Sequence, residues 1–235
     1  MICSHGRIIR PEWLDEQSPE AAAPSLHDLV LINRLLGGHE VLRKTMRDLV
    51  RADQAFTFLD VGAASGDMGR ALRERYALAR VTSLDYKEDH LHRAGAPRVC
   101  GDAFRLPFLD AAFDFVHCSL FLHHFTNEQA VVLLREFGRV SGRAVIVTDL
   151  ERHPLAYHFL PATRWLFGWD RITLHDGPIS VEAAFHKEEL EALGRAAGLK
   201  NLRVACYRPA FRLAMVASPA SRAEKIDTKQ PRTAL

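Results

Sequence analysis

From Phe56 onward, apolar runs of strand length alternate with amphipathic segments of helix length, and this alternation constrains the fold more than any other feature. The expected strands are 56–61, 80–84, 97–100, 113–118 and 143–149, and the expected helices are 66–76, 87–93 and 127–139. Strands joined by crossover helices pair in parallel, and parallel strands are buried on both faces. The run Ala144-Val145-Ile146-Val147 is typical of such a strand. The sequence therefore predicts an α/β fold with a doubly wound sheet.

The sheet is expected to be Rossmann-like and mostly parallel, with one antiparallel strand near the C-terminus. A helix at 186–197 ends at Gly198, and two strands follow at 200–207 and 211–217. The remaining segments are an arm with little structure (1–24), a helical hairpin broken at Gly37-Gly38 (25–51), an insertion after the fifth strand (152–180) and a disordered tail (218–235). Residues 25–217 are expected to form a single domain.

Composition excludes several classes of protein. The 235 residues have 48% hydrophobic and 26% charged side chains, which are globular values and argue against a disordered chain. The formal net charge is only +2, so no nucleic-acid partner is expected. No signal-peptide core and no apolar stretch of about 18 residues is present, so we expect a cytoplasmic protein without a membrane span. The oligomeric state stays open.

A strand that runs into a turn of small residues and then into a helix is the strongest local signal, at 58–69 (FLDVGAASGDMG). Small residues let a ligand approach the backbone, and the helix N-terminus offers unpaired N–H groups. A dinucleotide fingerprint would need glycines where Ala64 and Asp67 stand, and Asp67 would repel a pyrophosphate. The turn therefore favours an adenosine-bearing ligand without phosphates.

At this turn the chain resembles the class I S-adenosylmethionine-dependent methyltransferases. Asp60-Val61-Gly62-x-x-x-Gly66 is similar to their first motif, with Ala64 in place of the middle glycine. Further similarities follow in the family's order up to about residue 150. The resemblance implies S-adenosylmethionine as co-substrate and implies these cofactor-binding residues: Asp60, Gly62, Ala64, Gly66, Asp85 for the ribose, Tyr86, Asp102 and Ala103 for the adenine, and Ser119 near the methionine end.

Two adjacent histidines are the candidate catalytic residues. Methyl transfer to a phenolic oxygen needs a base near neutral pH, and histidine is suited to that role. His123 and His124 directly follow the fourth strand, so one of them is the candidate base; alternatively, each caps a helix or shapes the pocket. Side chains of neighbouring residues diverge on a helix or strand, and no metal-ligand spacing with a nearby carboxylate is visible, so no metal is expected.

The insertion holds many aromatic residues, which suits a cover over an aromatic or lipid-like small-molecule acceptor; alternatively, they pack on the core. Within it, Asp176-Gly177 is typical of a turn. The chain is most similar to the small-molecule branch of the family, which includes the ubiquinone and menaquinone type and enzymes of polyketide and phenolic-lipid pathways. We expect O-methylation of a phenolic or hydroxyl group. The alternatives are C-methylation of a quinone-like or polyketide ring, a non-catalytic binding module and, least favoured, a nicotinamide-dependent oxidoreductase.

Overall fold

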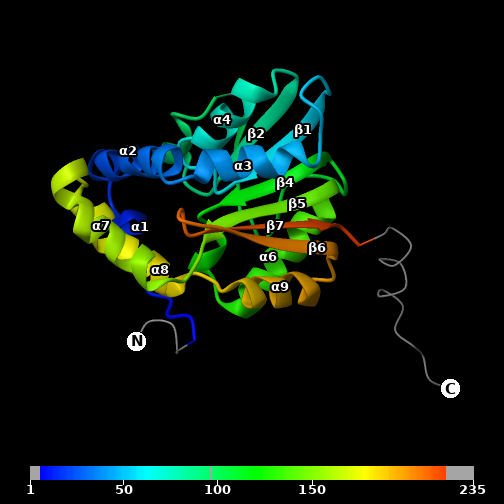
Figure 1. Ribbon diagram of the computed structural model, residues 1–235. Coiled ribbons are helices and arrows are strands. Elements are labelled where there is room, and N and C mark those ends of the chain that lie inside the picture. The colour runs from blue at the N-terminus through cyan, green and yellow to red at the C-terminus, as the bar shows by residue number, and fades with distance from the viewer. Residues whose placement is uncertain (1–5, 96, 221–235) are drawn as a thin grey trace.

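A seven-stranded sheet forms the centre of the molecule (Figure 1). The computed structural model describes residues 6–95 and 97–220. In chain order the elements are α1 (Trp13–Glu16), α2 (Pro19–Leu35), α3 (Gly38–Arg47), β1 (Phe56–Val61), α4 (Asp67–Arg75), β2 (Ala79–Asp85), α5 (Glu88–Leu91), β3 (Arg98–Cys100), β4 (Phe113–Ser119), the 3₁₀ turn η1 (Leu122–His124), α6 (Asn127–Val140), β5 (Ser141–Leu150), α7 (Pro154–Phe167), α8 (Arg171–Ala183), α9 (Lys187–Ala196), β6 (Lys200–Tyr207) and β7 (Arg212–Ser218).

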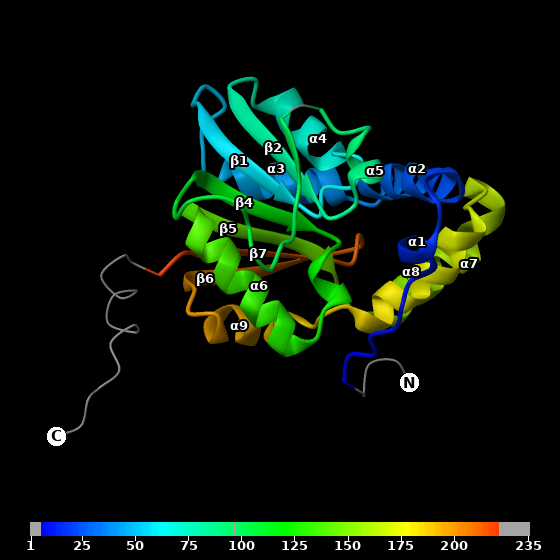
Figure 2. The same ribbon diagram turned by 180° about the vertical axis from the view of Figure 1, so that it is seen from behind.

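The strand order is β3-β2-β1-β4-β5-β7-β6, and β7 alone runs opposite to the other strands, so it pairs antiparallel with both β5 and β6. Helices α3 and α4 cover one face of the sheet, and α6 and α9 cover the other (Figures 1 and 2). The central strands β1, β4 and β5 are consequently buried on both sides, which explains their continuous apolar runs. The doubly wound sheet and its antiparallel strand are confirmed.

Beyond one end of the sheet, α1, α2, α7 and α8 form a cover (Figures 1 and 2). The expected hairpin is α2 and α3, and the expected insertion is α7 and α8. Asp176-Gly177 lies inside α8 and forms no turn. The glycine instead allows α7 and α8 to pack closely, because a Cβ at position 177 would lie 2.3 Å from Leu160 Cδ1. None of the described helices is both long and apolar enough to cross a bilayer.

The N-terminal segment is more ordered than its sequence suggests. Residues 1–24 were expected to have little structure, yet α1 and the beginning of α2 lie there. Ser18 caps α2 through its Oγ, which accepts from the N–H of Ala21, and Pro19 occupies the first helical position. At the other end, Ser218 closes β7. The rest of the expected tail lies mainly at 221–235, outside the described residues.

Candidate active site

A cavity of about 670 Å³ opens at the carboxyl ends of the parallel strands, under the cover of α1, α2, α7 and α8. Small-molecule sites in α/β sheets occur at this edge and have this size. Ten of the eleven residues predicted for the site line the cavity: Asp60, Gly62, Ala64, Asp85, Tyr86, Asp102, Ala103, Ser119, His123 and His124. Gly66 does not line it. Gly66 is the N-cap residue just before α4, with a φ of 68°, and a Cβ there would lie 2.8 Å from that of Ala94.

The turn after β1 is built from small residues, so its backbone lies close to the cavity. Gly62 has a φ of +65°, and a Cβ at this position would lie 2.3 Å from the ring of Phe121. Ala64 also has a left-handed backbone, with φ of 44°, which a small side chain adopts at moderate cost. The alanine therefore preserves the tight turn that the family pattern makes with glycine.

Asp85 links this turn to the end of β2. Its Oδ2 accepts a hydrogen bond from the N–H of Ala64 (2.8 Å), and its Oδ1 accepts from the N–H of Lys87 (3.0 Å). An ionised carboxylate has about four acceptor positions, so each oxygen can accept another donor. The carboxylate is thus held at the cavity wall with free capacity for two hydroxyl groups.

Next to Asp85, the cavity is open and lined by less buried residues. The Tyr86 side chain is exposed, with the residue 79% accessible. Asp102 accepts from the N–H of Phe104 (2.8 Å), which fixes the turn that carries Ala103. Deeper in the cavity, the hydroxyl of Ser119 is buried and has no hydrogen-bond partner among the described residues. The arrangement fits S-adenosylmethionine: an open end beside Tyr86 for a base, a carboxylate for a ribose, and a tight turn of small residues next to that carboxylate.

Beneath the turn lies a buried polar chain that the sequence analysis did not identify. His117 is fully buried; its Nδ1 lies 2.8 Å from Asp60 Oδ1 and its Nε2 lies 3.0 Å from Thr148 Oγ1. The three residues lie on the adjacent strands β1, β4 and β5, and Asp60 and His117 are direct partners in the parallel register. A histidine within an apolar strand was the available signal. This row of hydrogen bonds fixes the Asp60 carboxylate at the cavity wall.

His123 is held by a second buried carboxylate, at the end of β5. Its Nδ1 lies 2.6 Å from Asp149 Oδ1, and the N–H groups of Leu122 and His123 both donate to Asp149 Oδ2 (3.0 and 3.2 Å). Asp149 is completely buried. Such a carboxylate fixes the orientation of an imidazole and leaves Nε2 directed outward, here toward the cavity.

The outward side of His123 faces Glu12, a residue of the N-terminal segment. Glu12 Oε1 lies 3.8 Å from His123 Nε2 and 3.9 Å from His124 Nδ1. The two imidazoles stack with centroids 4.4 Å apart and planes 26° apart. The expectation that these neighbouring side chains diverge is wrong, because they lie on a 3₁₀ turn preceded by an irregular Phe121, and not on a regular helix or strand.

Glu12, His123 and His124 each offer one atom that can bind a metal, and these three atoms all lie within 4.8 Å of one another, so the residues could share a divalent cation. Sequence reasoning missed this grouping because Glu12 is more than a hundred residues away along the chain. The charges of the three groups offer another explanation for their proximity. A carboxylate on each side of His123, Asp149 and Glu12, attracts a protonated imidazole without any ion.

The two histidines are driven to opposite charge states. Burial alone would lower the pKa of His123, but the charge and hydrogen bond of Asp149, together with Glu12, raise that pKa to about 10. Burial lowers the pKa of His124, and the positive charge of His123 lowers it further. Burial would raise the pKa of Glu12, yet its contacts with the two histidines bring that pKa to about 2. Near neutral pH the group is therefore a carboxylate, an imidazolium and a neutral imidazole.

Glu12 reaches the cavity because the N-terminal segment is anchored at two points. The first anchor is the Arg7 guanidinium, which donates to backbone oxygens of His123 (2.9 Å), Phe125 (3.0 Å) and Ala183 (2.7 Å).

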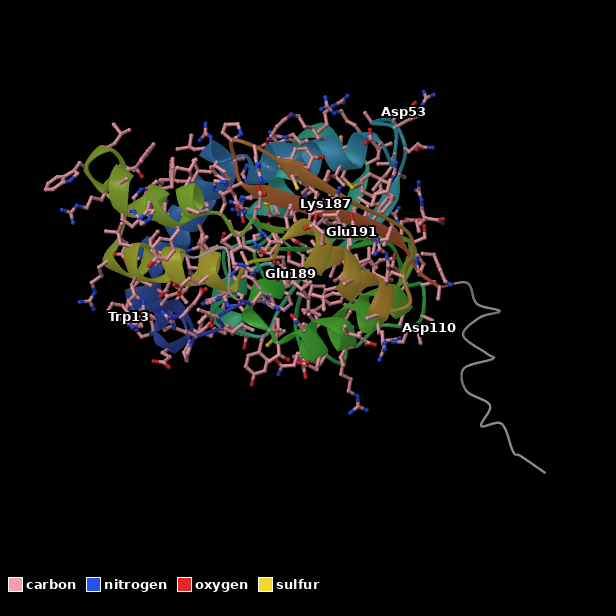
Figure 3. All side chains as sticks on the ribbon, turned by 60° about the horizontal axis from the view of Figure 1, so that its bottom comes forward. Trp13, Asp53, Asp110, Lys187, Glu189 and Glu191 are labelled. Atoms are coloured by element: carbon pink, nitrogen blue, oxygen red, sulfur yellow. The ribbon has the colours of Figure 1, made fainter. Side chains whose placement is uncertain are left out.

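The second anchor is Trp13, which lies where α1 meets α8 (Figure 3) and stacks on His175 at 3.6 Å. The Asp176 carboxylate accepts from the N–H groups of Trp13 and Leu14, both at 2.9 Å. The segment expected to be a loose arm is thus part of the cavity wall.

Comparison with known proteins agrees with this geometry. Residues 59–146 match a family described as "Methyltransferase domain". A demethylmenaquinone methyltransferase of Thermotoga maritima is 31% identical over 127 residues, which is 50% of this chain and 55% of that protein. The "Ubiquinone/menaquinone biosynthesis C-methyltransferase UbiE" of Paracoccus denitrificans is 29% identical over 163 residues, which is 63% of this chain and 62% of that one. The chain therefore spans less than two thirds of the length of both relatives.

Solved structures resemble the whole fold at low identity. A plantazolicin methyltransferase in complex with SAH has a TM-score of 0.64 at 15% identity, covering 85% of this chain and 89% of that one. A possible histamine N-methyltransferase of Thermotoga maritima has a TM-score of 0.58 at 16% identity, covering 82% and 93%. The domain match, the quinone-methyltransferase relatives and the fold support a class I S-adenosylmethionine-dependent methyltransferase, as the motif order predicted.

Proposed function

We propose that this protein transfers a methyl group from S-adenosylmethionine to the oxygen of a small apolar or aromatic acceptor that carries a hydroxyl group. The observation that carries the proposal is the stacked pair His123 and His124, with one ring protonated and one neutral, on the wall of a cavity that the expected cofactor-binding residues also line. Pairs of titratable groups with pKa values pushed apart are typical of acid and base partners.

The cofactor residues of this chain would hold S-adenosylmethionine as follows. Asp85 would accept hydrogen bonds from the ribose, Tyr86, Asp102 and Ala103 would line the adenine end, and the turn from Gly62 to Ala64 with Ser119 would face the methionine end. When bound, S-adenosylmethionine supplies an electrophilic methyl group on a positively charged sulfur. The protein's task is then to align the acceptor and remove its proton.

His124 and His123 would divide the work on the acceptor. The neutral His124 would accept the hydroxyl proton, and the carboxylate of Glu12 beside it would stabilise the imidazolium that forms. The cationic His123, fixed by Asp149, would stabilise the oxygen anion that the proton leaves behind. After transfer, the acceptor carries the methyl group on oxygen, and His124 returns its proton to solvent.

The second candidate is methylation of a ring carbon. The names of two relatives describe demethylmenaquinone methylation and C-methylation in ubiquinone and menaquinone biosynthesis. Deprotonating a ring hydroxyl also raises the electron density of the adjacent ring carbons. The same histidine pair would therefore serve this reaction, with the acceptor turned so that a carbon faces the methyl group.

Two measurements test the proposal. Calorimetry with S-adenosylhomocysteine is expected to show one site, and absence of binding would favour a non-catalytic binding module. Turnover is then measured with ¹³C-methyl S-adenosylmethionine on a set of phenolic and dihydroxynaphthalene acceptors, and NMR of the product separates a methoxy group from a ring methyl. A ring methyl as the main product would replace O-methylation with the second candidate.

A further inference from the structure

Helix α7 carries large apolar side chains on its outer surface. Trp165 is 85% accessible, Leu166 is 77% accessible and Leu155 is 64% accessible. Leu155, Ala162 and Leu166 are spaced seven and four residues apart, so they share one face of the helix. No residue of α7 is buried. Exposed apolar surface of this kind is rare on a monomeric soluble protein, and it marks an interaction site.

The side of α7 that lines the cavity is also apolar, and it adjoins this exposed face. Ala156, Phe159 and Leu160 line the cavity. The helix lies at the outer edge of the molecule, alongside α8 and away from the sheet, in both ribbon views (Figures 1 and 2). A helix that is apolar on two sides has a second nonpolar environment besides the protein core. Only one helix therefore separates that environment from the acceptor cavity.

Charge indicates what the outer face meets. Residues 153–169 contain no aspartate or glutamate. The exposed Arg164 lies over the ring of Trp165 at 4.7 Å, and the exposed Arg171 is the first residue of α8, just after α7 ends. Tryptophan and leucine flanked by arginine, without acidic residues, are typical of a helix that lies in the plane of a lipid surface. With 14 residues, α7 is also shorter than the ~20 needed to span a bilayer.

We propose that α7 docks on an anionic lipid surface, with Leu155, Trp165 and Leu166 inserted among the acyl chains and Arg164 and Arg171 at the headgroups. A second copy of the chain fits this face less well, because a two-fold interface pairs the face with itself, and residues 153–169 offer the arginines no acidic partner. The docking is independent of the chemistry in the cavity. Its use, collecting an apolar acceptor from the lipid phase beside the cavity, rests on the proposed function.

Vesicle binding of the full chain tests the docking without any acceptor. The protein is expected to co-sediment with vesicles of equal parts phosphatidylcholine and phosphatidylglycerol, and to bind more weakly to phosphatidylcholine alone or at high salt. The double variant Trp165→Ala/Leu166→Ala is expected to lower the partition coefficient about tenfold or more, because two large apolar groups no longer leave water. Arg164→Glu is expected to remove the preference for phosphatidylglycerol.

The matched control is Leu109→Ala, because Leu109 is 84% accessible and its neighbour Asp110 lies at the far end of the molecule from α7 (Figure 3). Leu109→Ala is expected to bind vesicles as the wild type does. Light scattering measures the oligomeric state in parallel. No vesicle binding by the wild type, equal binding by the double variant, or a wild-type dimer that the double variant dissociates without any lipid binding would each overturn the proposal. S-adenosylhomocysteine affinity is expected to be unchanged in all these variants, so a loss of vesicle binding is separated from a loss of the cofactor site.

Discussion

The two halves of the cavity are built in different ways. The half proposed to hold S-adenosylmethionine is lined by residues 60, 62–65, 85–86, 102–103 and 119, which lie at the ends of neighbouring strands and in their turns. The half proposed to hold the acceptor joins Glu12 of the N-terminal segment, the η1 turn, Asp149 of β5 and the cavity side of α7. One half is specified locally by a strand and its turn, whereas the other depends on contacts between distant segments. Variants in each half should therefore alter different measured quantities.

The largest effect is expected from His124→Gln in the acceptor half. Glutamine keeps a polar side chain but is no base, so kcat is expected to fall by about 10²- to 10⁴-fold. S-adenosylhomocysteine affinity, measured by calorimetry, is expected to be unchanged. His27→Gln, an exposed histidine on α2 outside the cavity, is the control and should keep full turnover. Full turnover in His124→Gln would show that the proton leaves by another route.

The next effect is expected in the cofactor half, from Asp85→Asn. The amide loses the negative charge and one acceptor oxygen, and each hydrogen bond to a charged group is worth ~1.5–3 kcal/mol, so S-adenosylhomocysteine should bind about 10- to 100-fold more weakly. The matched control is Asp53→Asn, because Asp53 is an exposed aspartate far from the cover of the cavity (Figure 3). Unchanged affinity in Asp85→Asn would show that the ribose does not meet this carboxylate.

The contrast between the two halves of the cavity also explains which parts of the fold and of the site could be predicted from the sequence. Strand bounds, the turn at Gly62 and the placement of Asp85 follow from local patterns and from the resemblance they carry, and the structure differs from the expected strands by at most two residues. His117 was overlooked because its partners, Asp60 and Thr148, lie on other strands. Glu12 could not be found either, since its approach to η1 requires the whole N-terminal segment to dock through Arg7 and Trp13.

A moderate effect, about tenfold in kcat at neutral pH, is expected from Glu12→Gln. Glu12 raises the pKa of both His123 and His124, so its removal lowers both. In the wild type, activity should rise with pH as His124 loses its proton, because its pKa lies below the ordinary value of 6.5. Activity should fall again as His123, whose pKa is about 10, loses its proton. Both limbs of the pH profile should move to lower pH in the variant, with S-adenosylhomocysteine affinity unchanged. A profile that keeps its position would show that Glu12 does not act on the pair.

The smallest effect, no change at all, is expected from removing metal. Glu12, His123 and His124 are close enough to share a divalent cation, but two carboxylates around one imidazolium already account for their approach. A cation at these atoms would compete with the protons on His123 and His124. A shared cation and a protonated His123 between two carboxylates therefore exclude each other at neutral pH. Chelator-treated protein should keep its kcat, and added zinc should leave it unchanged or lower it by occupying the base. Activity lost on chelation and restored by zinc would replace the acid–base pair with a metal centre in the acceptor half, while the cofactor half would keep its affinity for S-adenosylhomocysteine.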